Sequence, residues 1–296
     1  MKMKLAIGSV QFGMDYGAGG GKKVPLTELA PLFDFARQAG IDLIDTAPRY
    51  GDSEALIGRI AAGTVFPRIV TKTPHFPGER IAPEQIDRME AVFRRSMRQL
   101  RRAPLYAVLV HLAEDLLKPG AERIYERMIE WKAKGWVRKI GFSVYVGEEI
   151  DRVLERFSFD VVQLPINVLD QRLLAGGHLA RAKAAGLEIQ ARSVFLQGVL
   201  LLEPARVPPG LGRYRPRLEA LRRRWEALGL TPLEGAVRFI RSVPHIDDAI
   251  VGVHSLRQLR EVHRAFASPL GGAAELSFFE PFALNEEIGL LDPRRW

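Results

Sequence analysis

Residues 42–54, DLIDTAPRYGDSE, contain a short apolar run followed by a turn and the start of a helix. The run over 42–47 has the composition of a buried strand. Asp52 precedes a helical pattern over 53–62, and an acidic or hydroxyl side chain at this point is typical of a helix N-terminus. A strand that leads directly into a helix is the unit from which α/β proteins are built. This stretch therefore predicts the α/β class.

The same unit recurs along the whole chain. Besides 42–47, the sequence predicts strands at 4–9, 68–73, 106–112, 139–143, 160–165, 188–193 and 247–252. Helical patterns lie near 27–39, 53–62, 83–101, 121–134, 147–157, 172–185, 231–242 and 255–266, with an additional one near 216–228. Eight alternating units with nearly continuous apolar strands favour a closed (β/α)8 TIM barrel, because every strand is then buried on both faces. No Gly-x-Gly-x-x-Gly run follows an early strand, which argues against a Rossmann sheet.

Composition limits the possible classes of protein. The chain has 296 residues, is 47% hydrophobic and contains no low-complexity linker, so residues 1–296 are expected to form a single domain. The absence of cysteine excludes disulfides, thiolate nucleophiles and cysteine-bound metals, and no metal site is predicted. The N-terminus does not resemble a signal peptide and no apolar run reaches membrane-spanning length, so we expect a soluble cytoplasmic protein without a membrane partner.

The net charge of +8 raises the question of nucleic-acid binding. The densest arginine clusters lie within 94–102 and 213–224, where they are mixed with Glu, Leu and Ala in helical patterns. Solvated helix faces account for them, and no nucleic-acid partner is expected. For the second cluster, a basic patch facing an anionic cofactor is an alternative interpretation.

Four polar residues lie at or just after the ends of successive strands: Asp45, Tyr50, Lys72 and His111. Active sites of parallel barrels lie at these ends, and adjacent strands are only about 4.8 Å apart, so the four side chains can converge. A lysine ammonium favours the anion of a nearby tyrosine and so makes it a better proton donor, and Asp45 would pair with Lys72. His111 could hydrogen-bond a substrate oxygen. The group suits protonation of an alkoxide as it forms at a carbonyl.

Residues 45–54, DTAPRYGDSE, resemble the aldo-keto reductase signature DTAxxYGxSE, and Lys72 and His111 follow at that family's spacing. The resemblance extends over essentially the whole chain, including the segments 141–143 and 163–167. It implies a barrel oxidoreductase that uses NAD(P)H to reduce an aldehyde or ketone to an alcohol. In that reaction Tyr50 would donate the proton, Lys72 and Asp45 would tune it, and His111 would orient a small-molecule carbonyl substrate.

The resemblance also implies where the cofactor binds. Ser143 and Gln163 would hold the nicotinamide carboxamide, and Ser9 and Val10 would line its inner side. The residues expected beside the pyrophosphate are Arg192, Ser193, Phe195, Gln197 and Gly198, and those at the adenosine end are Gly252, His254, Ser255, Gln258 and Glu261. A helix that begins near Ser255 offers free N–H groups to a phosphate, which favours NADPH, with NADH possible. Arg257 or Arg260 would supply the positive charge.

The sequence departs from the family pattern in three places. Val144 replaces the asparagine that usually follows the fifth-strand serine. Arg192 occupies the position of the aromatic residue that stacks on the nicotinamide in many members, so Phe195 or the guanidinium itself would stand in. The first strand begins near residue 4, which leaves no room for the hairpin that covers the barrel floor in many relatives, and side chains alone are expected to close it.

Two other functions fit parts of the pattern. A strand-end lysine could form a Schiff base in a lyase, although a carboxylate at Asp45 would raise the pKa of Lys72 and keep it charged. A cofactor-binding regulatory subunit with little turnover is the second alternative. Neither the physiological substrate nor the oligomeric state is specified by the sequence.

Overall fold

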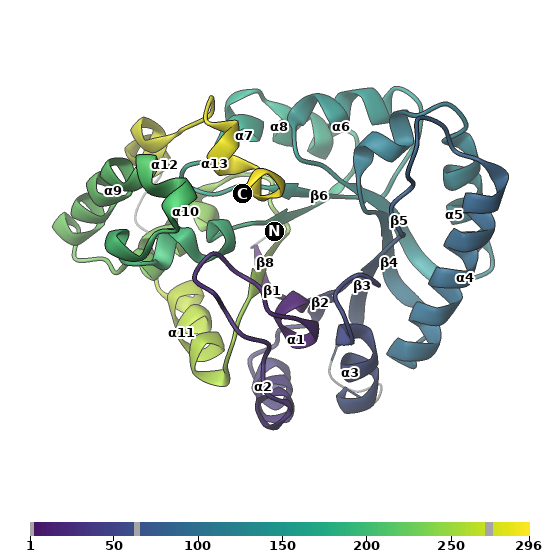
Figure 1. The fold of residues 1–296 in the computed structure, drawn as a ribbon, viewed down its shortest axis with the longest axis horizontal. Helices are drawn as coiled ribbons and strands as arrows, with labels where there is room; N and C mark the ends of the chain where they lie inside the picture. Colours follow the sequence, from purple (N-terminus) through teal and green to yellow (C-terminus); the bar gives the residue numbers. More distant parts are fainter. Residues whose placement is uncertain (1–2, 62–65, 270–274) are drawn as a thin grey trace.

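The computed structural model describes residues 3–61, 66–269 and 275–296. Eight parallel strands form a closed barrel in chain order (Figure 1). The strands are β1 (Lys4–Gly8), β2 (Leu43–Asp45), β3 (Arg68–Lys72), β4 (Leu105–Val110), β5 (Val137–Ser143), β6 (Val161–Pro165), β7 (Glu188–Arg192) and β8 (Asp248–Gly252). The barrel closes where all five residues of β1 pair in register with those of β8. The predicted (β/α)8 TIM barrel is confirmed.

Helices surround the barrel as an outer layer (Figure 1). The longer ones are α2 (Leu26–Gln38), α3 (Ser53–Ile60), α4 (Pro83–Leu100), α5 (Glu122–Ala133), α6 (Gly147–Leu154), α8 (His178–Ala184), α9 (Arg215–Ala227), α10 (Pro232–Ser242) and α11 (Leu256–Ala267). Short helices add α1 (Val10–Gly13), α7 (Arg172–Ala175), α12 (Glu275–Phe279) and α13 (Ile288–Leu291). Within the described ranges, no helix combines the length and apolar character needed to cross a membrane.

Two segments differ from the sequence prediction. The helix expected over 172–185 is two helices, α7 and α8, because Gly177 adopts a left-handed conformation with φ of 70° that ends one helix before the next begins. The stretch 203–215, which lies outside the predicted helices and strands, contains the 3₁₀ turns η3 (Pro204–Arg206) and η4 (Pro209–Tyr214). Leu211 and Tyr214 in the second turn are buried, so this stretch packs on the barrel.

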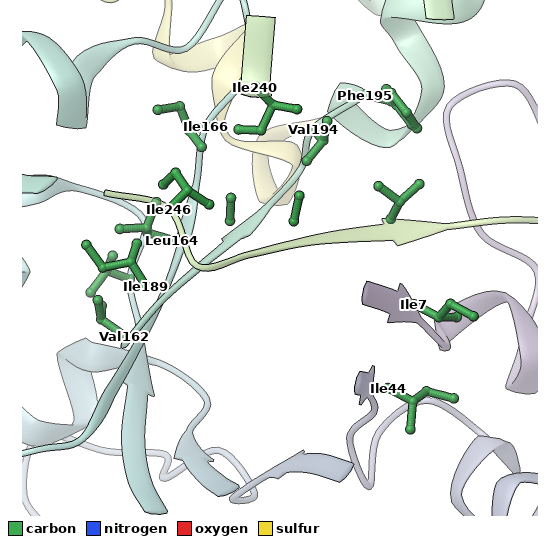
Figure 2. Packing of buried hydrophobic residues seen from close by; sticks show 14 of the residues in the cluster. Ile7, Ile44, Val162, Leu164, Ile166, Ile189, Val194, Phe195, Ile240 and Ile246 are labelled. Atoms are coloured by element: carbon green, nitrogen blue, oxygen red, sulfur yellow. The ribbon is translucent and has the colours of Figure 1, made fainter. Parts of the chain in front are cut away.

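Period-two alternation along the strands divides the core into two clusters. The smaller cluster lies inside the barrel and consists of Ala6, Leu43, Val70, Ala107, Leu109, Val161 and Ile250. The residues between them belong to the larger cluster, which joins the outer face of the barrel to the helices. Figure 2 shows part of this larger cluster, including Val162 and Leu164 of β6 and Ile189 of β7.

The same alternation carries polar side chains to both ends of the barrel. Arg68 and Lys72 share the inward face of β3 with Val70 between them, so Arg68 lies at one end, which we call the floor, and Lys72 at the opposite end, which we call the mouth. At the floor, Arg68 donates to Asp248 at 2.8 Å and to Asp42 at 2.6 Å, as part of an ion-pair network of side chains. Side chains of this network thus lie across the floor.

Candidate active site

The barrel brings the four predicted catalytic side chains together at its mouth. Asp45 ends β2, Lys72 ends β3, and His111 directly follows β4. Lys72 Nζ donates to Asp45 Oδ1 at 2.6 Å and to the carbonyl oxygen of Thr46 at 3.0 Å. The side chains of Lys72 and Asp45 are only 1% and 6% exposed. The two residues form a buried ion pair, as predicted.

Tyr50 is positioned by an unusually close crossing of two backbone segments. A Cβ atom on Gly13 would lie 1.7 Å from the carbonyl oxygen of Tyr50, and one on Gly51 would lie 2.3 Å from that of Gly13. Only glycine permits this approach, and Gly51 also has a φ of 58°. The Tyr50 ring centroid lies 5.3 Å from Lys72 Nζ and 6.3 Å from the His111 ring centroid.

The last two residues of the signature act as scaffold. Ser53 Oγ donates to Ser9 Oγ at 2.8 Å, which ties α3 to the end of β1. Glu54 accepts hydrogen bonds from Thr71 at 2.6 Å on β3 and from Ser96 at 3.0 Å on α4. These bonds fix the start of α3, and with it the loop that carries Tyr50.

Burial controls the acid–base properties of Tyr50 and His111. Burial raises the pKa of Tyr50 well above its ordinary value, the Asp45 carboxylate adds to the rise, and the Arg192 guanidinium opposes it. The pKa of Tyr50 therefore changes in the opposite direction from the lowering expected from Lys72, because burial is the largest influence and the Asp45 carboxylate adds to it. Burial also holds the pKa of His111 well below its ordinary value, with Lys72 and Arg49 adding to the effect. At neutral pH the phenol is protonated and the imidazole is neutral.

Lys72 also departs from expectation. The sequence predicts that Asp45 raises the pKa of Lys72, but burial is the larger influence and lowers it, while the carboxylate opposes this change. A buried cation is destabilised by the loss of its hydration, and one carboxylate oxygen offsets only part of that loss.

Arg192 lies across the mouth. Its Nη2 donates to the carbonyl oxygen of Val144 at 2.8 Å, so the side chain reaches from β7 past β6 to the loop after β5. Its guanidinium stacks on Tyr145, with Cζ 4.3 Å from the ring centroid. Arg294 stacks on the same ring at 3.7 Å. The usual aromatic is thus replaced by an arginine held in place by a neighbouring tyrosine.

The residues expected around the nicotinamide take several roles. Ser143 ends β5 and pairs in register with Gln163 of β6. Gln163 Nε2 donates to Asp45 Oδ1 at 2.8 Å, so this side chain supports the ion pair. Ser9 is completely buried and its hydroxyl is bound to Ser53, whereas half-buried Val10 begins α1. A direct contact of the Ser9 side chain with a ligand does not fit this geometry.

The residues expected near the pyrophosphate form a tight turn after β7. Ser193, Gln197 and Gly198 have φ values of 59°, 52° and 92°. Phe195 is 9% exposed and packs into the core, so its ring is not presented as an open platform. The carbonyl oxygen of Gln197 accepts a hydrogen bond from Ala18 N at 3.0 Å, which joins this turn to the loop after β1.

At the adenosine end, α11 begins directly after Ser255, as predicted, but its first N–H groups are partly occupied by caps. Ser255 Oγ accepts a hydrogen bond from Gln258 N at 3.2 Å, and Gln258 Oε1 accepts one from His254 N at 2.8 Å. Glu261 is exposed, and its carboxylate lies 3.9 Å from Arg257 Nε. The predicted residues therefore lie together around this helix start.

Two side chains that the sequence did not indicate also lie at this end. The Glu28 carboxylate accepts a hydrogen bond from Leu256 N at 3.0 Å. One of the N–H groups at the start of α11 is therefore already bound to an acid. Gln11 packs against Gly252, where a Cβ would lie 2.2 Å from its amide nitrogen. Gln11 Oε1 is buried without a hydrogen-bond partner. An acceptor left unpaired in this way fits the hydroxyl and amide donors of a nicotinamide dinucleotide.

Three further residues near Tyr50 were not predicted from the sequence: Arg49, Tyr16 and Tyr145. Arg49, Arg192 and Tyr145 all influence the pKa of Tyr50, and Tyr16 lies close enough that Tyr50 helps raise its pKa to about 12, after the larger effect of burial. Arg49 lies inside the signature and could have been noticed for its position beside Tyr50. Tyr16 and Tyr145 come from loops, whose approach to the mouth depends on the fold.

Comparison with known proteins agrees with this geometry. The model of the Aldo/keto reductase family matches residues 4–272. An aldo-keto reductase from Bacillus halodurans in its holo form is similar in structure, with a TM-score of 0.77 at 19% identity over 95% of this chain and 92% of that one. A glycerol dehydrogenase from Gluconobacter oxydans has a TM-score of 0.70 at 20% identity over 98% and 92%. No curated protein sequence matches significantly. With a family match over most of its length, the chain belongs to the aldo/keto reductase family.

Proposed function

We propose that this protein reduces the carbonyl group of a small aldehyde or ketone, with Tyr50 as proton donor. Membership of the family makes the chain an oxidoreductase that uses a nicotinamide cofactor. The observation that carries the finer proposal is the cluster at the mouth. A buried ion pair of Lys72 and Asp45 at 2.6 Å lies beside the rings of Tyr50 and His111. A buried ion pair contributes little net stability to a fold, so its presence here supports a functional role.

Each side chain has a distinct part in the proposed reaction. The reduced cofactor, when bound, supplies the hydride. Tyr50, which burial keeps protonated, donates its proton to the carbonyl oxygen as negative charge develops there. The neutral ring of His111 can donate a hydrogen bond to the same oxygen and orient it without adding a charge. Gln163 and Lys72 hold Asp45 from two sides, so the positions of the charges are fixed before the reaction begins.

For the cofactor, we propose NADPH, with NADH as the alternative. Arg257 and Arg260 near the start of α11 support NADPH, since a 2′-phosphate needs cationic partners. The Glu28 carboxylate at Leu256 N favours NADH, because it repels a phosphate and can accept hydrogen bonds from ribose hydroxyls. Dissociation constants for both cofactors, measured by quenching of protein fluorescence, decide between them.

The test of the proposed function is a panel of aldehydes, dicarbonyls, ketoses and steroids followed at 340 nm with each cofactor. Tyr50→Phe should reduce kcat by roughly 100-fold to 10,000-fold, the range for loss of a general acid. The cofactor dissociation constant should stay that of the wild type, because the change removes one hydroxyl. Equal rates for the wild type and the variant would contradict the assignment of Tyr50.

The two other functions make different predictions for the same samples. A Schiff-base lyase would give a covalent Lys72 adduct on borohydride treatment with a carbonyl compound. The lowered pKa of Lys72 suits that chemistry, but its side chain is only 1% exposed and its Nζ is bound to Asp45, which leaves no open approach. A regulatory subunit would bind the cofactor and show no turnover with any carbonyl. Turnover that depends on Tyr50 excludes both.

A further inference from the structure

Two arginines around the mouth have no acid partner within the described part of the chain. Most acids in this region are paired with cations, and Glu28 and Glu149 accept hydrogen bonds from backbone N–H groups instead. Carboxylates in the loops that follow the strands already have cationic partners: Asp15 with Lys22, Asp52 with Lys23, Asp115 with Lys118, Asp170 with Arg172, and Glu114 with Arg294. Asp45 is taken by Lys72. Among the described residues, Arg49 and Arg192 form no ion pair with any acid. Two guanidinium groups at the mouth therefore lack a counter-charge.

Arg192 is the more informative of the two because it is partly buried. Its Nη2 bonds to the carbonyl oxygen of Val144 and its Nη1 to Ser193 Oγ at 3.2 Å, both uncharged acceptors. A guanidinium has five N–H donors, so these bonds leave others unused. Its plane is fixed by stacking on Tyr145, which reduces the entropy lost when a further ligand binds. A partly desolvated cation held in place without an acid is arranged to accept an anion.

The position of the two arginines relative to the reacting group follows from the strands. Arg192 ends β7 and reaches the loop after β5, so its guanidinium passes above Ser143 and Gln163. Gln163 is bonded to Asp45, the partner of Lys72. Arg49 directly precedes Tyr50 in its turn. Both guanidinium groups act on Tyr50 and on His111, in each case in the direction of added positive charge.

From this charge balance we infer that the preferred substrate is a carbonyl compound that itself carries an anionic group, a carboxylate or a phosphate, bound by Arg192 and Arg49. The inference rests on the proposed function and names its substrate class. The carbonyl oxygen lies at Tyr50 and His111, and the anionic group lies toward the guanidinium of Arg192. Planar, bidentate recognition of this kind is the usual reason for arginine at an anion site.

The test compares matched carbonyl compounds that differ in the anionic group. The probes are 4-oxobutanoate against butanal, and glyceraldehyde 3-phosphate against glyceraldehyde, with kcat and KM measured at 340 nm for each. The ratio of kcat/KM between the charged and the uncharged member should be about 10 to 100 in the wild type, the range for one or two charge-assisted hydrogen bonds. The two pairs of probes distinguish a carboxylate from a phosphate.

Variants assign this preference to residues. Arg192→Gln should bring the ratio close to one, and Arg49→Gln should lower it by a smaller factor because Arg49 is exposed. Arg88→Gln is the matched control, since it removes the same charge from an exposed position on α4 and should keep the wild-type ratio. Calorimetric titration with succinate, an unreactive dicarboxylate, should show binding to the wild type and none to Arg192→Gln.

Failure of this inference is separate from failure of the proposed function. Turnover of butanal and 4-oxobutanoate with equal kcat/KM overturns the anionic substrate and leaves carbonyl reduction standing. Absence of turnover with every carbonyl overturns the proposed function itself. If Arg192→Gln weakens cofactor binding and leaves the substrate ratio unchanged, the arginine serves the cofactor, and the inference is wrong.

Discussion

The two ends of the barrel hold charged side chains on the same strands but use them differently. At the floor, Arg68 lies among Asp42, Asp248 and Glu188, and Glu188 also accepts from Lys139 at 2.6 Å. At the mouth, Lys72 has one acid partner. The floor surrounds a cavity of about 550 Å³ whose charged lining residues are ion-paired, most of them with one another. At the mouth, the guanidinium groups of Arg49 and Arg192 have no acid partner among the described residues.

This difference shows how to distinguish structural charges from functional ones in a single barrel. Several carboxylates around each cation offset its desolvation, and a network of that kind lies across the floor. A buried cation with one partner, near a tyrosine and a neutral histidine, costs stability, which supports the catalytic role proposed for this group. Removing one cation from each end tests this difference between the floor and the mouth.

Lys72→Met at the mouth should have the largest effect. It leaves the Asp45 carboxylate buried and unpaired, which should lower the free energy of unfolding by about 3–5 kcal/mol, and it should lower kcat by roughly 100-fold or more. Urea unfolding and the 340 nm assay measure the two effects. The double variant Asp45→Asn/Lys72→Met should regain stability without activity. Unchanged urea unfolding of the single variant would show that the pair is not desolvated.

Arg68→Met at the floor should affect stability alone. It removes the shared partner of Asp42 and Asp248, so the free energy of unfolding should fall by about 3 kcal/mol. The wild-type kcat should be retained, since Arg68 lies at the opposite end of the barrel from Tyr50. Arg88→Met, at an exposed position on α4, is the control for loss of a charge. A large drop in kcat with native stability would contradict the division between the two ends.

The ends should also differ in their response to acid. His111 has a folded pKa below the ordinary 6.5, so the unfolded chain takes up a proton that the folded chain does not, and stability falls as the pH drops below about 6.5. At the floor, cationic partners hold the pKa values of Asp42 and Glu188 below the ordinary 3.8 and 4.5 against burial. The stability that Asp42 and Glu188 contribute is fully present above their ordinary pKa values. It is lost as the pH falls through their lower pKa values in the folded state.

The prediction for His111 is the smallest in size. Between pH 7.5 and 5.5 the wild type should lose up to about 1 kcal/mol per pH unit below 6.5, and His111→Asn should lose less. Urea unfolding at the two pH values measures this difference. His245→Asn is the control, because His245 is exposed and its φ of 70° is one that asparagine accepts. If His111→Asn has the same pH dependence as the wild type, burial of His111 is not its cause.

The sequence was sufficient for most of the fold. Alternation of nearly continuous apolar runs with helical patterns predicted the eight strands. The glycines that directly follow four of the predicted helices, at 40, 135, 186 and 229, all have positive φ. Where the prediction failed, at Gly177, the helical periodicity of 172–185 continued through a residue whose backbone breaks the helix. Local composition does not reveal which glycine in such a run turns left-handed, since helix packing decides it.

For the candidate site, the sequence by itself determined which residue types end the strands, and so the Asp45–Lys72 pair and the neighbouring Tyr50 and His111. Only the tertiary structure decided their electrostatics. The pKa of Lys72 follows burial more than its acid partner, and Arg192 lacks a partner because acids from other loops are paired elsewhere. The physical reason is that covalent order sets the strand on which a side chain lies, whereas burial and charge balance depend on segments far apart in the sequence.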